Sequence, residues 1–345
     1  YTAPPFVASP LSPMFIIYLC SGTGNFPAAL HTAGGGKITT VTIDTKVGGY
    51  AHDISREKVA TQLIELASNE SCVGVLASFP CKTWSTARFN QPGPPLLRDI
   101  DEPEGIRDAT GDLPSEVLRP NAIVANGTRI LRAAHAHGAA IIIEAPPSNS
   151  TGEYAIEGRE GHASMFTMPT IVSFANDTRA RQVTFDQCAL KAASKKPTGL
   201  LATLNIFDIV NRLFGKLKCT HDHRGEGLKG VDANGTFRTA GAESYPPAMN
   251  ALLADAFVQH TLGTRADNHT IPPMSHNPVT SLISSEPKAA NDNPMPHDPM
   301  KTQAQPKVRF SPMLAWCECL NLGRRSNETT DLDGCVACEE CSESP

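Results

Sequence analysis

The sequence predicts an α/β protein with a largely parallel sheet and helices on both of its faces. Between residue 14 and about residue 260, short apolar segments alternate with amphipathic ones, which is the order of repeated βαβ units. Most of the apolar segments run directly into small polar turns, and in open sheets of this kind the ligand lies at the carboxyl ends of the strands. The chain of 345 residues has room for one substantial core and a smaller appendage.

The individual strands and helices follow from hydrophobic periodicity. The predicted strands are short apolar runs bounded by turn residues, at 15 to 19, 38 to 44, 72 to 79 and 139 to 144. The predicted helices repeat apolar residues three or four positions apart, at 26 to 34, 57 to 68 and 122 to 138. Residues 90 to 120 interrupt this alternation with Gly, Pro and acidic residues, so they predict a long connection of the kind that is functional or mobile.

Composition separates this body from the two ends of the chain. Residues 1 to 13 form an N-terminal extension, and residues 14 to 262 form the α/β body. Residues 263 to 312 are rich in Pro, Asn and Ser, which predicts a disordered linker. Residues 313 to 345 form a small Cys-rich tail.

Charge and hydropathy limit the partners of the protein. A net charge of −5 gives no global basic field, so nucleic acid would be held by local basic patches. Lys195 and Lys196 could meet phosphates, although a solvated lysine pair is the better explanation of them. The longest apolar run near the start, MFIIYLC, is far shorter than the roughly 20 residues of a membrane span, and no basic segment precedes it. We therefore expect no membrane partner and an intracellular location.

Ten cysteines suggest metal sites rather than a disulfide framework, because half of them crowd the tail. There, C-x-C is followed after fifteen residues by C-x2-C-x2-C, which predicts zinc ligands at Cys317, Cys319, Cys335 and Cys338, with Cys341 as a competitor. An unstructured Cys-rich end is the alternative. In the body, the C-x-H-x-H series of Cys219, His221 and His223 offers zinc ligands together with Cys188, but alternation along a surface strand would give the same pattern.

Each predicted strand ends in a chemically useful group. The first is followed by Gly22 and Gly24, which let the backbone approach a ligand or simply form a tight turn. The second ends in Asp44, where an acid can accept hydrogen bonds from ribose hydroxyls or remain a solvated turn residue. The third leads to Cys81 and the fourth ends in Glu144, for which a buried unreactive thiol and a salt-bridged carboxylate are the alternatives.

The order of these groups resembles the successive motifs of the cytosine-5 methyltransferases, which use S-adenosylmethionine. The segments that carry the resemblance are LCSGTGNFPAAL, TID, HDI, SFPCKTWS, IIIEAP and DTRARQVTF, and GAESYPPAMNALLADA is similar to the segment that returns to the cofactor pocket. The resemblance implies a Rossmann-like methyltransferase fold over residues 14 to 262. It implies cofactor contacts from Cys20, Gly22, Gly24, Asn25, Phe26, Asp44, Asp53, Ile54 and Pro80, and catalytic roles for Cys81, Glu144, Arg179 and Arg181.

The chemistry agrees with these residue types. Carbon 5 of cytosine is a poor nucleophile, and a thiolate that adds to carbon 6 turns the ring into an enamine that can attack a methyl group. Glu144 would hydrogen-bond the ring nitrogen while charge develops there. A thiol at a strand end with guanidinium groups nearby is expected to have a lowered pKa. The expected partner is DNA or RNA.

Several features depart from the family and keep other functions open. Lys82 stands where the family has Gln, and Ala145 and Pro146 stand where it has Asn and Val, the Asn of which helps to fix the nucleophile loop. Residues 182 to 240 are short for a separate target-recognition region. The FDQC, KPT and QPGPPLLRD segments are similar to methyltransferase-like domains of eukaryotic mobile elements. The alternatives are an inactive nucleic-acid or cofactor-binding module of a mobile-element or viral polyprotein, an amino (N6-adenine) methyltransferase, and a nicotinamide dehydrogenase, which would leave the Pro-Cys pair and Glu144 without a purpose.

Overall fold

The computed structural model describes residues 14–22, 24–89, 95–150, 152–192, 194–221, 223 and 244–263. The predicted N-terminal extension, the tail with its five cysteines, and all of the predicted linker but its first residue lie outside the described residues. Within the described part, no helix combines the length and the apolar character needed to cross a membrane.

A six-stranded sheet forms the centre of the body. Its strands are β1 (Met14–Leu19), β2 (Ile38–Ile43), β3 (Cys72–Ala77), β4 (Ala140–Ala145), β5 (Arg181–Asp186) and β6 (Pro197–Ala202). They lie in the order β2-β1-β3-β4-β6-β5. The pairs β1–β2, β1–β3 and β3–β4 are parallel, whereas β6 runs antiparallel to both β4 and β5. The prediction of an α/β fold with a largely parallel sheet is confirmed, and the reversed β6 is an addition to it.

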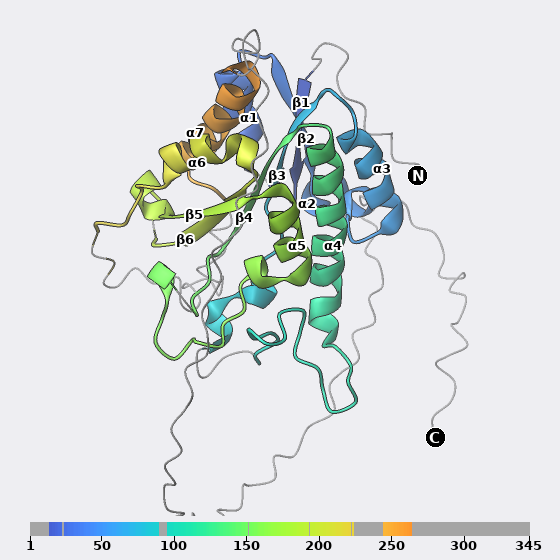
Figure 1. Ribbon diagram of the computed structural model, residues 1–345, viewed down its shortest axis with the longest axis vertical. Helices are drawn as coiled ribbons and strands as arrows, with labels where there is room; N and C mark the ends of the chain where they lie inside the picture. Colours follow the sequence, from blue (N-terminus) through green and yellow to red (C-terminus); the bar gives the residue numbers. More distant parts are fainter. Residues whose placement is uncertain are drawn as a thin grey trace, which may run out of the picture. The chain divides into compact units, whose positions relative to one another are not determined.

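Helices cover both faces of this sheet, as predicted (Figure 1). One face carries α1 (Phe26–Ala33), α6 (Leu204–Phe214) and α7 (Pro247–Val258), and the other carries α3 (Glu57–Ala67), α4 (Ser115–Ala136) and α5 (Pro169–Thr178). Every residue of β1 and of β4 is buried, which is how strands read when both faces of a parallel sheet are covered. Alternate side chains of each strand therefore enter two separate cores.

Short helical turns connect these elements at the carboxyl ends of the strands. The helix α2 (Thr45–Gly48) and the 3-10 turn η1 (Gly49–His52) follow β2, and η2 (Lys82–Trp84) and η3 (Thr86–Phe89) follow β3. The turns η4 (Gly152–Tyr154) and η5 (Met165–Thr167) follow β4, and η6 (Gln187–Leu190) follows β5. A final turn of π-helix, η8 (Gln259–Gly263), extends α7.

Two stretches differ from the sequence prediction. The helix α4 begins at Ser115 rather than at residue 122, and Pro120 lies inside it. Proline predicts a helix break because it lacks an N–H, and at Pro120, the sixth residue of α4, the helix continues without the hydrogen bond to the carbonyl of Glu116. The stretch from 182 to 240, predicted as a short recognition or insert region, instead supplies most of β5, all of β6 and α6, which complete the sheet.

Candidate functional site

A cavity of about 80 Å³ lies beside the carboxyl ends of β1 and β2. This is where the strand order changes direction, between β1 and β3, the position at which open α/β sheets bind ligands. Its walls include five of the residues predicted to contact a cofactor: Cys20, Asp44, Asp53, Ile54 and Pro80. Arg119 and Ile123 of α4 close the opposite side.

Asp44 joins the ends of the first two strands. One carboxylate oxygen accepts the backbone N–H of Gly22 at 2.8 Å, and the other accepts that of Lys46 at 2.7 Å, where Asp44 caps α2. Gly22 has a φ of 57°, a conformation that favours glycine, so this turn does require one. The carboxylate thus holds the first turn against the second while each oxygen retains capacity for a further donor.

Asp53 is the second acid of this cavity. Its side chain is 14% exposed and lies 3.2 Å from the guanidinium of Arg119. Burial raises the pKa of Asp53, but hydrogen bonds from the hydroxyl and backbone N–H of Ser55, together with Arg119, outweigh burial and hold the pKa below its ordinary value. Asp53 is therefore ionised at neutral pH. Asn126 of α4 fixes the same loop by donating to the carbonyl of Ile54 at 3.0 Å.

Cys20 contributes a neutral thiol to this cavity. It has a φ of 55°, in the left-handed region that is uncommon for a residue with a side chain. Burial, and then the nearby carboxylate of Asp44, raise the pKa of its thiol to about 12. Cys20 is therefore a wall of the cavity and not a nucleophile at neutral pH.

Four of the predicted cofactor residues do not line this cavity: Gly22, Gly24, Asn25 and Phe26. Phe26 is fully buried, with its ring 5.2 Å from Tyr18 and 6.1 Å from Phe257 between ring centroids. Because burying a Phe side chain contributes about 1.5 to 3 kcal/mol, packing in the core explains the position of Phe26, and its predicted cofactor contact stays a prediction. Asn25 is exposed at the start of α1, and a Cβ at Gly24 would meet only the carbonyl of Ser21, at 3.7 Å.

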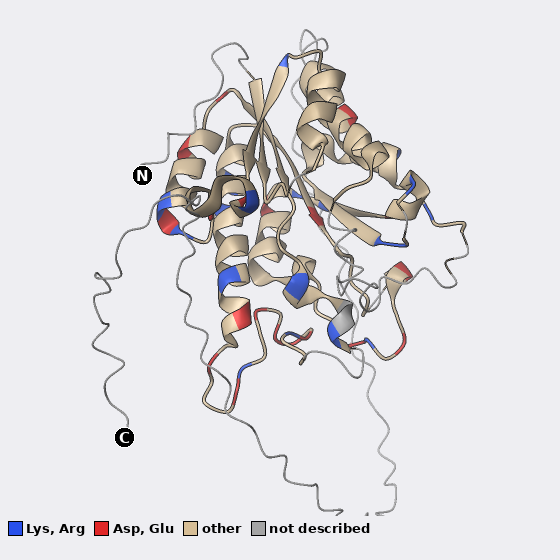
Figure 2. Ribbon diagram, turned by 180° about the vertical axis from the view of Figure 1, so that it is seen from behind, with Lys and Arg blue, Asp and Glu red and all other residues tan. Residues whose placement is uncertain are grey.

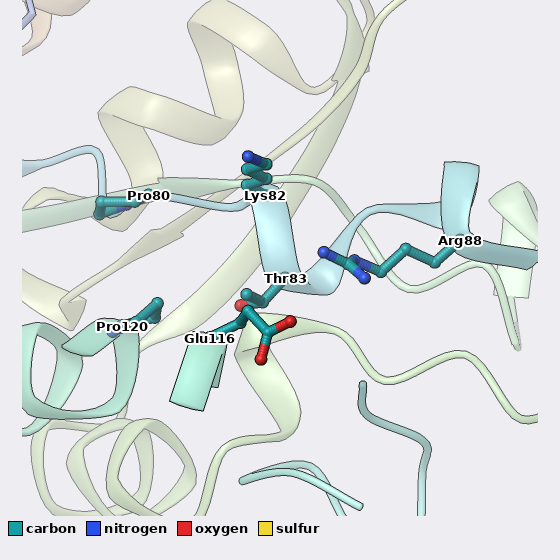
Figure 3. Close-up of a pocket in the computed structure, with 6 residues that line it drawn as sticks. All are labelled: Pro80, Lys82, Thr83, Arg88, Glu116 and Pro120. Carbon is teal, nitrogen blue, oxygen red and sulfur yellow. The ribbon is translucent and has the colours of Figure 1, made fainter. Parts of the chain in front are cut away.

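A second, larger cavity of about 310 Å³ lies on the other side of Pro80. Its walls come from the turn after β3 and from the first turns of α4: Pro80, Lys82, Thr83, Arg88, Glu116 and Pro120. Figure 3 shows the guanidinium of Arg88 and the carboxylate of Glu116 extending toward the space beside Thr83, whereas Lys82 points away from Glu116. Basic and acidic residues are mixed along the loops at this end of the sheet (Figure 2). Cys81, next to Pro80, is half-buried.

Loop side chains fix the turn that follows Cys81. We name Thr83, Trp84, Arg98 and His162 the loop assembly. Arg98 is 2% exposed; its guanidinium stacks 3.8 Å over the Trp84 ring and donates to the Thr83 hydroxyl at 3.2 Å and to the carbonyl of Pro103 at 2.8 Å. Burial lowers the pKa of Arg98 to about 10, so it remains charged at neutral pH. Nδ1 of His162 accepts the N–H of Asn149, which leaves Nε2 to donate to the Trp84 carbonyl at 2.9 Å.

A chain of hydroxyl groups leads to Glu144 from the ends of β1 and β3 and from Tyr245, which precedes α7. We name Tyr18, Ser78, Glu144 and Tyr245 the strand-end network. The hydroxyl of Tyr245 donates to Oε2 of Glu144 at 3.0 Å and also contacts the hydroxyl of Ser78, which lies 3.5 Å from that of Tyr18. Glu144 is 7% exposed. Burial raises the pKa of Tyr18 to about 12 and that of Tyr245 well above its ordinary value, so both hydroxyls keep their protons and can donate.

The predicted arginine pair does not join this site. Arg179 and Arg181 are both exposed, and Arg181 is the first residue of β5. Arg181 pairs with Ala202 of β6, and Ala202 pairs with Ile142 of β4. Arg181 therefore lies two strands away from β4, level with a residue two positions before Glu144. Its guanidinium lies 5.5 Å from the ring centroid of Phe207 on α6. The basic residues that line the larger cavity are instead Lys82 and Arg88.

Cys188, Cys219, His221 and His223 meet at the end of β5, with their donor atoms within 4.8 Å of one another. Lys195 and Lys196 precede β6, and because β6 is reversed they also lie at the edge formed by the carboxyl ends of the other strands.

Comparisons with models of known protein families, with curated proteins and with solved structures gave no match.

Sequence reasoning missed most of the residues that support this site. Tyr245 had a local signal, since it lies in the segment expected to return to the cofactor pocket. Arg98 and His162 had none, because nothing in their neighbourhoods distinguishes them from surface residues of a long loop. Arg119 was missed because residues 90 to 120 were predicted as a long connection, whereas it is the fifth residue of α4.

Proposed function

We propose that the protein transfers a methyl group from S-adenosylmethionine to carbon 5 of cytosine in DNA or RNA, through a covalent adduct with Cys81. One observation carries this proposal. Pro80 lines both cavities and Lys82 lines the larger one, so Cys81 lies in the chain between residues of these walls, while Cys81 itself lines neither cavity. A nucleophile that must work next to a cofactor on one side and a base on the other needs this position.

The donor groups of the smaller cavity suit the nucleoside part of such a cofactor. Asp44 retains acceptor capacity for ribose hydroxyls, and the apolar side chain of Ile54 beside ionised Asp53 offers a contact for an adenine. The volume of about 80 Å³ is below the roughly 300 Å³ of most ligand pockets, so it would hold one part of the cofactor. The wall that can move is Arg119, whose side chain is 58% exposed.

The residues of the chain would act as follows, while the cofactor supplies an electrophilic methyl group. The thiolate of Cys81 would add to carbon 6 of the base, carbon 5 would take the methyl group as its bond to the cofactor's sulfonium sulfur breaks, and loss of the carbon-5 proton to water would expel the Cys81 thiolate and restore the ring. Glu144 holds a proton near the ring nitrogen during these steps. Since Tyr245 is bonded to Oε2, Oε1 is the oxygen that we assign to the base.

The loop assembly would take over the role of the Asn that cytosine-5 methyltransferases have at the position of Ala145. Ala145 and Pro146 offer no side-chain hydrogen bond to the nucleophile loop. Arg98 and His162 hold the turn after Cys81 instead, the first through Thr83 and the Trp84 ring and the second through the Trp84 carbonyl. This arrangement supports a fixed nucleophile without the family's residue, and so favours an enzyme over an inactive module.

The reversed strand argues against a nicotinamide dehydrogenase. Dinucleotide-binding enzymes build a parallel sheet from two similar halves, each of which binds one nucleotide. Here the second half contains β6, which runs against both of its neighbours. The sheet therefore offers one nucleoside site, at the ends of β1 and β2.

Covalent trapping tests the mechanism. With S-adenosylmethionine present, an oligonucleotide containing 5-fluorocytosine should form a denaturation-resistant complex with the protein, because fluorine blocks the final proton removal. Cys81→Ala should abolish both trapping and methyl transfer, and Glu144→Gln should slow transfer by about 10²-fold or more. Cys72→Ala is the matched control: Cys72 lies at the start of the same strand, and burial raises its pKa to about 12, so its loss should leave trapping intact.

The outcomes of that experiment separate the candidate functions. Methyl transfer that survives Cys81→Ala would overturn the cytosine-5 mechanism and favour the amino methyltransferase. Cofactor binding without transfer to cytosine or adenine in DNA or RNA would favour the inactive module.

Calorimetry tests the cofactor site independently of catalysis. Asp44→Ala should weaken S-adenosylmethionine binding by about 1 to 3 kcal/mol, because the ribose hydroxyls lose their acceptor. Asp101→Ala changes an exposed acid outside the cavity and should leave the affinity unaltered. Unchanged affinity in Asp44→Ala, with binding intact in the wild type, would remove the ribose role from Asp44.

A further inference from the structure

Four soft donor side chains converge at the end of β5, in a place that the proposed methyl transfer does not use. The thiols of Cys188 and Cys219 and the rings of His221 and His223 present one donor atom each, all within 4.8 Å of one another. Sγ of Cys219 lies 3.1 Å from Nε2 of His223 and 3.9 Å from Nδ1 of His221. Cys188 is buried, whereas His221 is exposed, so the group closes an outer corner of the body.

The fold explains how residues so far apart in sequence meet. Cys188 lies in η6, directly after β5. The helix α6 carries the chain away and ends at Phe214, after which residues 215 to 219 return to the end of β5. Asp186 makes two hydrogen bonds to residues 215 to 219. Its N–H donates to the carbonyl of Leu217 at 3.0 Å, and its carboxylate accepts the N–H of Cys219 at 3.0 Å.

The chain then curls so that its alternate side chains point inward. A fully extended strand would spread the Cα atoms of residues 219 and 223 over about 13 Å, too far for one shared ligand. The thiol of Cys219 instead lies 3.6 Å from the carbonyl oxygen of His221, which shows that the backbone bends round the sulfur. The rings of His221 and His223 stand edge to face with centroids 5.8 Å apart, so both can turn a nitrogen toward the same point.

These distances approach those of a tetrahedral metal site. With bonds of about 2.3 Å to sulfur and 2.0 Å to nitrogen, donor atoms around zinc lie roughly 3.3 to 3.8 Å apart. The widest separation in this group therefore has to shorten by about 1 Å, which side-chain rotation supplies. Two sulfurs and two imidazoles select zinc over magnesium or calcium, which require oxygen ligands, and two cysteines are too few for the usual iron–sulfur cluster.

We propose that Cys188, Cys219, His221 and His223 bind one zinc ion in a closed structural site. Four protein ligands leave no open position for water or substrate, so the ion fastens the returning segment to the end of β5 and does not take part in catalysis. Lys218 supports the same attachment, since its ammonium donates to the carbonyl of Thr184 at 3.1 Å and pairs with Glu153 at 2.6 Å. This proposal stands whether or not the protein is a methyltransferase.

The test uses the full chain with Cys317, Cys319, Cys335, Cys338 and Cys341 changed to serine, so that the tail contributes no thiolate. We call it the tail-serine chain. Purified without chelator or oxidant, it should contain about one equivalent of zinc. Cys219→Ser and His223→Asn in this background should remove most of the zinc. The matched control is His137→Asn, which changes an exposed histidine at the end of α4 and should retain the full equivalent.

A second measurement does not depend on variants that could fail to fold. Cobalt added to chelator-treated tail-serine chain should produce the visible bands of a tetrahedral ion together with thiolate-to-metal charge transfer. Chelation should lower the midpoint of thermal unfolding, and zinc but not magnesium should restore it. Cys81→Ala should behave as the parent chain does, which separates this site from the proposed catalytic one.

Three results would overturn the proposal. One is less than about half an equivalent of zinc in the tail-serine chain. Another is a zinc content that Cys219→Ser does not change. The third is an intact mass showing a disulfide between Cys188 and Cys219 in protein kept under reducing conditions, since the two thiols would then be joined and not available as ligands.

Discussion

Two polar assemblies hold the chain on either side of Cys81, and they are built in different ways. The strand-end network contains Ser78, three residues before Cys81, and joins it to Tyr18 and Glu144 at the ends of β1 and β4 and to Tyr245 before α7. The loop assembly lies after Cys81 and collects an arginine and a histidine from two irregular segments, at 95 to 114 and at 146 to 164. The sheet positions most side chains of the strand-end network, whereas the side chains of the loop assembly are held mainly by contacts with one another and with nearby loops.

This difference has an energetic consequence. A strand end is fixed by ladder hydrogen bonds and by cores on both faces, so the loss of one hydroxyl removes a single interaction. A loop without ladder bonds depends on each side chain that anchors it. The loop assembly should therefore be the more sensitive of the two to a single substitution.

Arg98→Ala is expected to have the largest effect, lowering the free energy of unfolding by about 3 kcal/mol. It removes the stacking partner of Trp84 and leaves the buried Thr83 hydroxyl and the Pro103 carbonyl without their donor. Denaturant titration checks this. Arg107→Ala, at an exposed arginine of the same irregular segment, should change stability by no more than about 0.5 kcal/mol. An effect of Arg98→Ala as small as that of the control would show that the loop does not depend on its anchor.

Tyr245→Phe should have a smaller effect, of about 1 to 3 kcal/mol. It leaves Oε2 of the buried Glu144 without its donor while keeping the ring in the core. Tyr50→Phe, which removes a hydroxyl from a tyrosine that is 71% exposed, is the matched control and should be neutral. If the strand-end network also positions Glu144 for chemistry, methyl transfer should fall in Tyr245→Phe at temperatures where the variant is fully folded. Unaltered transfer would limit the network to a structural role.

His162→Gln should have the smallest effect and should appear only at low pH. Burial lowers the pKa of His162 below its ordinary value of 6.5, so the folded protein resists protonation more than the unfolded chain does. Stability should therefore decrease as the pH falls below about 6.5, and it should decrease less in His162→Gln, whose amide can still donate to the Trp84 carbonyl without titrating. The pKa values of His52 and His260 are also lowered, but they are present in both proteins and cancel in the difference. If the stability of the wild type and of His162→Gln depended on pH in the same way, His162 would not be the source of the acid sensitivity.

The sequence predicted what lies on strands better than what lies on loops. Asp44 was predicted because it follows a buried apolar run, and the ends of parallel strands meet at one edge of a sheet, whereas Cys20 and Pro80 came from the family resemblance. Arg98 and His162 were not, because their partners lie 15 and 78 positions away, across loops without periodicity. The arginine pair lies apart from the smaller cavity for another reason: Arg179 precedes β5 and Arg181 begins it, so both lie at the opposite end of the strand from the site.

Pro120 gives α4 two parts with different dynamics. A proline has no N–H to donate to the carbonyl of Glu116 four residues earlier, so the first turns are held to the rest of the helix by one hydrogen bond fewer. Glu116 and Arg119, which face the larger and the smaller cavity, both lie before this break, whereas the buried stretch from Ile123 to Ala134 lies after it. Amide hydrogens of residues 116 to 119 should consequently exchange with solvent faster than those of the later turns. Faster exchange in residues 116 to 119 alone would show that the part of α4 that lines the cavities opens independently of its core half.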